Sequence, residues 1–213
     1  MMPVTELFTE KHRDEMVAFY RSYDAAAEKL LFRALPPVRV KTVFYGDSIT
    51  WGFALHEFFP GRSLLNRGIP GDNLNGLYFR MDEDVFPYRP EQVVFLAGIN
   101  QIGEENPVMM RRYREIGRLL NDAGSRVYFC SVLPVRHGDQ WNRFRFRDKI
   151  VELNALLREM AERDFAGFID YHSALLDENR ELAKKFARPD GTHITFDGYR
   201  VMARILGEKV RLD

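Results

Sequence analysis

The sequence lacks a second cysteine, because Cys130 is the only one among 213 residues. No disulfide can therefore form within the chain, which suits a reducing compartment. Cys130 follows Val127, Tyr128 and Phe129 in an apolar run that is typical of a buried strand. We therefore expect an inert core thiol and not a catalytic one.

Long apolar runs are missing as well. No stretch approaches the roughly 18 apolar residues that a membrane span requires, so we expect no membrane span. The N-terminus carries several charged residues with no apolar run behind them, which does not fit a signal peptide. We expect a cytoplasmic protein.

An excess of charge of either sign is also absent, because 31 Lys and Arg residues balance 31 Asp and Glu residues. Proteins that bind nucleic acids generally carry a positive excess. Residues 136–147 are locally basic and aromatic, with Trp141, Phe144 and Phe146, but Asp139 and Asp148 lie at the edges of this segment. We expect no nucleic-acid partner and interpret the segment as a solvated helix start or a loop that borders a substrate pocket.

The motifs of several ligand-binding classes are missing too. The chain contains no G-x-x-x-x-G-K-[ST] phosphate loop, no H-E-x-x-H zinc motif and no C-x-x-C pair. A flavin-binding domain would rest on analogy of fold alone. We expect no cofactor and no metal.

The apolar residues that are present form short runs, which alternate with helical patterns after residue 38. Near-continuous apolar runs separated by helices are typical of a parallel sheet covered on both faces. We therefore predict an α/β fold of three layers, α/β/α, with a five-stranded parallel sheet. The predicted strands are residues 40–45, 63–66, 92–97, 126–131 and 167–170, and the predicted helices are residues 74–82, 108–123, 142–163, 174–186 and 196–210.

The first 37 residues show a pattern of their own. Apolar residues such as Met16, Tyr20, Leu30 and Leu31 recur at helical spacing, and Pro36-Pro37 ends the pattern. We predict an amphipathic helical segment over residues 1–37 that packs on a main domain of residues 38–213. The helix could instead pair with another subunit, which leaves a homo-oligomer open.

Reactive residues follow three of the predicted strands. Ser48 lies in Gly46-Asp47-Ser48-Ile49-Thr50, Gly71 in Gly68-Ile69-Pro70-Gly71-Asp72, and Asn100 in Gly98-Ile99-Asn100-Gln101. Open parallel sheets bind ligands at the carboxyl ends of their strands, so we expect these residues to border one site. The segment Asp190-Gly191-Thr192-His193, just before the last helix, could reach the same edge.

Ser48 has two interpretations. It could merely cap the short helix that follows, which is the more ordinary role for an isolated serine. It could also be a nucleophile, because the N–H groups at a helix start favour developing negative charge, and it would then need a base. His193 fits best, since Asp190 in the same turn could fix its tautomer; His137 could touch substrate, and His172 is a reserve candidate.

Attack on an ester also creates an oxyanion, which needs preoriented donors. The backbone N–H groups of Ser48 and Gly71 and the side-chain amide of Asn100 could converge on it. Gly71 could equally belong to a simple turn, and Asn100 could merely close its own loop through an Asx-turn. The residues by themselves leave both alternatives open.

The combination of the four blocks around Ser48, Gly71, Asn100 and His193 resembles the SGNH/GDSL hydrolase family. Within this family the chain is similar to platelet-activating-factor acetylhydrolase-like esterases, from about residue 38 to the last helix. The resemblance implies a flavodoxin-like sheet and a Ser-His-Asp hydrolase without metal. It assigns Ser48 as nucleophile, Asp190 and His193 as the other triad members, and Ser48, Gly71 and Asn100 as oxyanion donors.

Two positions depart from the family pattern. Gln101 occupies the position of the usual aspartate, which puts the bracing of its loop in question, and Asn73 occupies that of a frequent threonine. We expect an esterase that cleaves short-chain acyl esters, above all acetyl esters, of small molecules through an acyl-enzyme. The alternatives are a thioesterase or lysophospholipase and, from another class, a catalytically idle sugar- or acyl-binding module, which Gln101 would favour.

Overall fold

Five parallel strands form one sheet in the order β2-β1-β3-β4-β5. The computed structural model describes residues 2–212, except for the side chains of residues 23–26. The predicted fold is confirmed, and each strand ends within two residues of its predicted bounds. The strands are β1 (Thr42–Gly46), β2 (Leu64–Gly68), β3 (Gln92–Leu96), β4 (Arg126–Cys130) and β5 (Gly167–Ile169).

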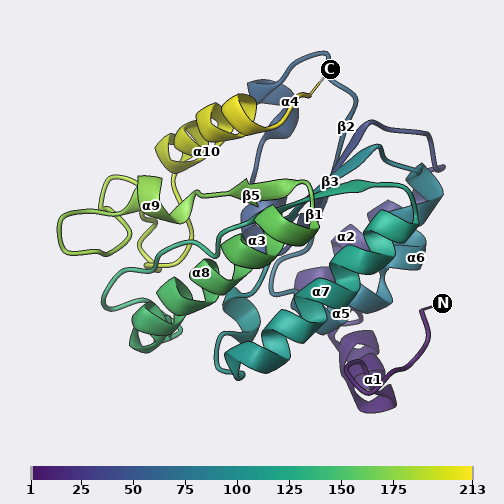
Figure 1. Ribbon diagram of the computed structural model, residues 1–213, viewed down its shortest axis with the longest axis horizontal. Helices are drawn as coiled ribbons and strands as arrows, with labels where there is room; N and C mark the ends of the chain where they lie inside the picture. Colours follow the sequence, from purple (N-terminus) through teal and green to yellow (C-terminus); the bar gives the residue numbers. More distant parts are fainter. Residues whose placement is uncertain (1, 213) are drawn as a thin grey trace.

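Helices cover both faces of this sheet (Figure 1). Successive strand residues point to opposite faces. Val43 and Tyr45 of β1 therefore pack with α5 (Leu74–Phe79), α7 (Asn106–Asp122) and α8 (Arg147–Asp164), whereas Phe44 packs with α3 (Ser48–Trp51) and α10 (Phe196–Lys209). Because both faces of the sheet are buried, the strand sequences are nearly continuous apolar runs.

The other helices around the sheet are short. They are α4 (Leu55–Phe58), α6 (Met81–Asp84), α9 (His172–Leu175), η1 (Phe86–Tyr88), η2 (Ile99–Gln101) and η3 (Arg143–Phe146).

The strand register brings three loops to the same edge. Gly46, the last residue of β1, lies opposite Gly68 on β2 and Leu96 on β3. The segments that begin at Asp47, Ile69 and Ala97 therefore leave the sheet side by side. This alignment is what allows residues from three separate blocks to meet.

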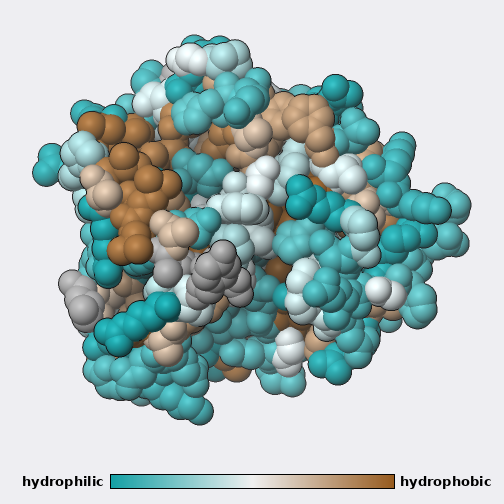
Figure 2. Space-filling view, turned by 180° about the vertical axis from the view of Figure 1, so that it is seen from behind, coloured by the Kyte–Doolittle hydropathy of each residue, from teal (hydrophilic) through white to brown (hydrophobic). Residues whose placement is uncertain are grey.

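The N-terminal segment differs from the prediction, because it forms two helices instead of one. Helix α1 (Glu10–Phe19) ends in a turn over residues 20–22, and α2 (Tyr23–Ala34) follows. Lys29 on α2 is buried and pairs with Glu83 at 2.7 Å and Asp84 at 3.1 Å. The buried residue is thus a lysine, whereas Leu30 and Leu31 are 66% and 55% exposed. Figure 2 shows apolar side chains gathered on one part of the molecular surface.

The predicted helix over residues 174–186 is wrong. Helix α9 ends at Leu175, and the chain continues through irregular structure with isolated bridges from Leu176 to Leu182 and from Ala187 to Ile194. The Asp177 carboxylate accepts hydrogen bonds from the backbone N–H groups two and four residues later. Such side-chain bonds compete with helix formation, and they form a turn here.

Among the described residues, no helix combines the length and the apolar character that a membrane crossing requires.

Candidate active site

Ser48 begins α3 directly after β1, at the carboxyl edge of the sheet. The preceding Asp47 is the N-cap residue of α3, and its carboxylate accepts a hydrogen bond from the Ile49 backbone N–H at 3.0 Å. The hydroxyl of Ser48 is therefore held at a helix start, and it remains partly exposed. Capping of this helix is the role of Asp47, so the ordinary interpretation of Ser48 as the cap is not needed.

His193 faces this hydroxyl. Its Nε2 lies 2.9 Å from Ser48 Oγ, although 145 residues separate the two in the sequence. Its Nδ1 lies 3.1 Å from Asp190 Oδ2. The other Asp190 oxygen accepts from the backbone N–H groups of Thr192 and His193, both at 2.8 Å, and Gly191 supplies the positive φ of 73° that this tight turn requires.

The charge of Asp190 is maintained by these contacts. Partial burial by itself would raise its pKa, but the hydrogen bonds from the backbone N–H groups of His193 and Thr192 and from the imidazole outweigh burial and lower the pKa. Asp190 is therefore a carboxylate at neutral pH. A carboxylate on Nδ1 keeps a proton on that nitrogen and leaves Nε2 free to accept one from Ser48.

Asn100 has a fixed amide orientation. Its Nδ2 donates to the backbone oxygen of Asp72 at 2.7 Å, while its Oδ1 accepts from the Arg143 guanidinium at 2.7 Å. Because a guanidinium can only donate and a carbonyl oxygen can only accept, the amide nitrogen and oxygen cannot be exchanged. The Asn100 amide nitrogen carries two hydrogens, and the bond to Asp72 uses only one of them.

Gly71 lies in the loop after β2 with a φ of 79°, a conformation that favours glycine. The residue borders the same cleft as Ser48 and Asn100. Within residues 2–212, the backbone N–H groups of Gly71 and Ser48 have no hydrogen-bond acceptor. Ser48, Gly71 and Asn100 therefore border one cleft, and the backbone N–H groups of Ser48 and Gly71 are not used by the rest of the described chain.

Gln101 braces its loop despite its departure from the family pattern. Its Oε1 accepts from the Leu74 backbone N–H at 2.8 Å, and its Nε2 donates to Glu104 at 3.3 Å. Asn73 is the N-cap of α5 and accepts from the N–H groups of Asn75 and Gly76. Gln101 therefore joins the loop of Asn100 to α5, and Asn73 caps the start of α5.

The residues around Ser48 enclose an open cleft of about 660 Å³, which we call the Ser48 cleft. The sequence indicated some of its residues but missed those from the N-terminal helices and Arg188, for which no local motif exists. The lining residues are Phe19, Ala27, Glu28, Ser48, Trp51, Gly52, Pro70, Gly71, Asn100, Trp141, Arg143, Arg188, His193 and Tyr199.

The basic and aromatic segment over residues 136–147 borders this cleft, as one of its two interpretations predicted. The Trp141 ring packs edge-on against His193, with 5.4 Å between the ring centroids. Arg143 lies 4.7 Å over the Trp141 ring and also holds Asn100. The segment therefore contacts both the imidazole and the amide of the site.

The other titratable candidates lie elsewhere. His137 is not among the cleft residues, and its ring packs on Phe144. His172 is buried away from the cleft, and burial lowers its pKa. Cys130 is buried as predicted, and burial raises the pKa of its thiol. Within residues 2–212 no cluster of His, Cys, Asp or Glu could hold a metal ion.

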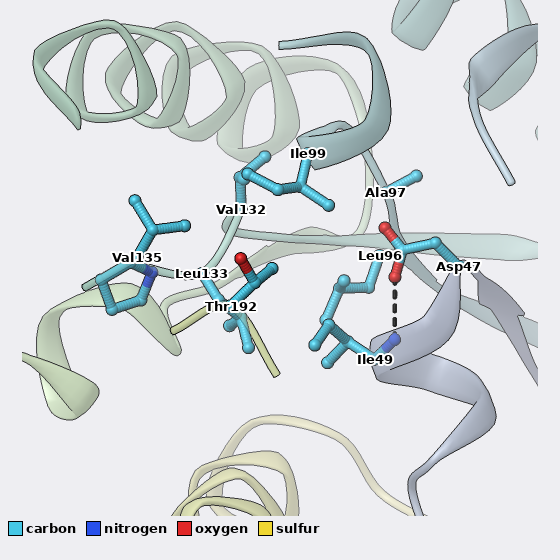
Figure 3. Close-up of a pocket in the computed structure, with 10 residues that line it drawn as sticks. Asp47, Ile49, Leu96, Ala97, Ile99, Val132, Leu133, Val135 and Thr192 are labelled. Atoms are coloured by element: carbon cyan, nitrogen blue, oxygen red, sulfur yellow. Dashed lines mark hydrogen bonds between the residues drawn. The ribbon is translucent and has the colours of Figure 1, made fainter. Parts of the chain in front are cut away.

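A second, smaller pocket lies beside Asp47 and Ile49, the chain neighbours of Ser48 (Figure 3). It measures about 10 Å³, is mostly apolar and is bordered by Asp47 and Thr192. Asp47 Oδ2 and Thr192 Oγ1 are buried there without a partner among the described residues. Burial raises the pKa of Asp47 to about 7.

Comparisons with known proteins identify a family and similar folds. A family model described as GDSL-like Lipase/Acylhydrolase matches residues 44–201, and no curated protein sequence matches the chain. Similar solved structures include a protein described as an acylhydrolase from Bacteroides fragilis, with 26% identity, a TM-score of 0.78 and coverage of 88% of this chain and 96% of that one. A GDSL-like lipase from Bacteroides thetaiotaomicron has 26% identity, a TM-score of 0.74 and coverage of 86% and 95%. A protein from Streptococcus pneumoniae described as a platelet activating factor has 21% identity, a TM-score of 0.74 and coverage of 92% and 97%.

Proposed function

The chain belongs to the GDSL-like lipase/acylhydrolase family, and from this premise we propose that it is a serine esterase that cleaves short-chain acyl esters through an acyl-enzyme. The observation that carries the proposal is the alignment of Ser48 Oγ, His193 and Asp190, with contacts of 2.9 and 3.1 Å. A hydroxyl, an imidazole and a carboxylate in this order form the arrangement that activates a serine.

In the first half of the reaction, His193 Nε2 takes the proton of the Ser48 hydroxyl while Oγ attacks the ester carbonyl. The imidazolium that forms is stabilised by Asp190, which remains ionised. His193 then gives its proton to the leaving alcohol, and the acyl group stays on Ser48. In the second half, water attacks the acyl-enzyme with His193 again as base, which releases the acid and restores the serine.

The negative charge of each tetrahedral intermediate falls between the unused donors in front of Ser48. We assign the Ser48 and Gly71 backbone N–H groups and the Asn100 amide to this oxyanion. Donors that are already oriented need no reorganisation during the reaction, and loss of one typically costs about 100- to 1,000-fold in kcat. The contacts of Asn100 with Asp72 and Arg143 support such preorganisation.

Two aromatic residues of the Ser48 cleft support a ring-shaped leaving group. Trp51 and Trp141 border the cleft and are 51% and 42% exposed. Exposed aromatic faces beside a catalytic serine offer flat surfaces for a ring such as a sugar. We therefore propose acetyl esters, with a carbohydrate as the leaving group, as the preferred substrates.

The test compares the parent with Ser48→Ala on 4-nitrophenyl acetate and butyrate. We expect Ser48→Ala to lose at least about 10³-fold in kcat, because residues that act as a unit fail together. A fluorophosphonate probe should label the parent at Ser48, as located by peptide mass spectrometry, and should leave Ser48→Ala unlabelled. Equal rates for the two proteins would refute the proposal, and an unlabelled, inactive parent would identify an idle binding module.

The leaving group is tested by a panel of acetylated sugars, an acyl-CoA and a lysophospholipid at equal concentrations. We expect the acetylated sugars to give the highest kcat/KM. A higher value for acyl-CoA or lysophospholipid would identify a thioesterase or a lysophospholipase on the same catalytic residues.

A further inference from the structure

Helix α1 reaches the Ser48 cleft because α5 allows a close approach. Gly76 of α5 has no side chain, and a Cβ there would clash with the Tyr20 hydroxyl and the Asp72 carboxylate. At the end of α1, the Phe19 ring borders the cleft and lies 3.2 Å from where a Cβ on Gly71 would be. These α1 residues precede the family-matched range, which begins at residue 44.

The Tyr20 hydroxyl donates a hydrogen bond to Asp72 Oδ1 at 2.9 Å, although 52 residues separate the two in the sequence. Asp72 is fully buried, and its other carboxylate oxygen accepts from Arg80 Nε at 2.7 Å. Its backbone oxygen accepts from the Asn100 amide at 2.7 Å, and its neighbour in the chain is Gly71. Asp72 therefore joins Tyr20 to Gly71 and Asn100, the two proposed oxyanion donors that lie outside α3.

The protonation states of Tyr20 and Asp72 agree with a hydrogen bond from the Tyr20 hydroxyl to the Asp72 carboxylate. Burial raises the pKa of Tyr20 well above its ordinary value, so the hydroxyl keeps its proton and acts as a donor. Burial also raises the pKa of Asp72, whereas Arg80 and the Tyr20 hydroxyl act in the opposite sense and favour the carboxylate. Without Tyr20, one of the groups that hold Asp72 in place would be lost.

We propose that Tyr20 is a positioning residue for the oxyanion side of the site: through Asp72 it orients the Gly71 N–H and the Asn100 amide. The inference rests on the proposed esterase function. It makes the N-terminal segment part of the catalytic apparatus and not only a cover for the sheet. Tyr20 itself touches no reacting atom and is absent from the residues that border the Ser48 cleft.

The chain contains a matched control for a purely structural role. The Tyr78 hydroxyl on α5 donates to the Pro3 backbone oxygen at 2.9 Å and thus also ties the N-terminal segment to the main domain. Its hydroxyl makes no hydrogen bond to Asp72 or Asn100. Tyr20→Phe and Tyr78→Phe each remove one hydroxyl, and each keeps the ring.

The experiment measures kcat and KM for 4-nitrophenyl acetate in the parent, Tyr20→Phe, Tyr78→Phe and Ser48→Ala. Active-site titration with a fluorophosphonate counts the competent molecules, so partial unfolding cannot imitate a loss of kcat. We expect Tyr20→Phe to lose about tenfold in kcat with KM within about twofold, because small misplacements of catalytic groups act on the transition state. Tyr78→Phe should keep the parental kcat and KM.

An unchanged kcat in Tyr20→Phe, or an equal loss in Tyr78→Phe, would overturn the inference while leaving the esterase assignment intact. Equal hydrolysis by the parent and Ser48→Ala would overturn both, and this comparison does not involve Tyr20. The two failures are therefore distinguishable in one set of measurements.

Discussion

Asp47 is buried beside Ser48 and has two different carboxylate oxygens. Oδ1 caps α3 through the Ile49 N–H, whereas Oδ2 faces the small pocket that Thr192 also borders (Figure 3). Burial raises the pKa of Asp47 to about 7. The folded chain therefore binds a proton at Asp47 more tightly than the unfolded chain does, in which an aspartate has a pKa of about 3.9.

This difference predicts a pH-dependent loss of stability. Where the folded state binds more protons than the unfolded state, the free energy of unfolding falls as pH rises, here between about 4 and 7. Asp47→Asn cannot titrate and should lack this fall. Between pH 5 and pH 8 we expect the free energy of unfolding of the parent to decrease by roughly 2–3 kcal/mol relative to Asp47→Asn. Urea unfolding of both proteins at the two pH values measures it, and parallel behaviour would contradict the raised pKa.

Gln101 leads to a second prediction. Gln101→Ala leaves the buried Leu74 N–H without its acceptor, and an unsatisfied buried donor costs about 1–3 kcal/mol. We expect urea unfolding to reveal a loss of this size in Gln101→Ala. Gln140→Ala, a change at an exposed glutamine, is the control and should stay near the parent. A loss as small as that of the control would mean that the loop does not depend on Gln101.

The contacts of the site differ in how far the sequence could predict them. The Asp190–His193 pair lies within one turn, and Ser48 follows a strand, so local patterns indicated both. The bonds of Arg143 to Asn100 and of Tyr20 to Asp72 join residues 43 and 52 positions apart. Such contacts depend on how whole elements pack, and no local spacing encodes them.

The crossing of α1 over α5 depends on the absence of a side chain at Gly76. Gly76→Ala would force a methyl group against Asp72 and Tyr20, and overpacking of this kind costs typically about 1–3 kcal/mol. We expect both a lower free energy of unfolding and a lower kcat, because Asp72 shares this contact and lies beside Gly71, which we propose as an oxyanion donor.

Gly207 on α10 provides the opposite case. Nothing lies within 4 Å of a Cβ at this position, and alanine favours a helix over glycine by about 1 kcal/mol. Gly207→Ala should therefore raise the free energy of unfolding and leave kcat unchanged. Thermal and urea unfolding of the two variants side by side would test the pair, and equal effects at both positions would contradict the assigned packing at Gly76.

The elements themselves were predictable where one pattern dominated. The five strands have near-continuous apolar runs because helices bury both faces of the sheet. The break between α1 and α2 was missed, because the apolar spacing continues across the turn at residues 20–22, whereas in the structure Lys29 is buried and Leu30 and Leu31 are exposed. The predicted helix after Leu175 failed for another local reason, the turn around Asp177.

The whole molecule carries a formal net charge of +0 at pH 7 and exposes apolar residues on α2. Without net charge, molecules repel one another weakly near neutral pH. Exposed apolar patches then favour association. We expect the attraction between protein molecules, measured by static light scattering, to be strongest near pH 7 and to weaken toward pH 9.

A charge-neutral double substitution separates the two causes. Leu30→Lys with Leu31→Glu removes the apolar pair and keeps the net charge, so we expect weaker attraction at pH 7. Val151→Glu with Leu156→Lys on α8 changes two scattered residues, each 37% exposed, and should have little effect. Equal behaviour of the two double variants would assign the attraction to the missing net charge alone.

The distance along the chain between Ser48 and His193 has a consequence for synthesis. Strand β5, the last of the sheet, ends at Ile169, whereas His193 comes 24 positions later and meets a serine 145 residues behind it. Domains begin to fold while the ribosome is still adding residues. A nascent chain can thus assemble its sheet while Ser48 still lacks the base that we propose for it, so the proposed hydrolysis can begin only after His193 has been added and has folded against Ser48.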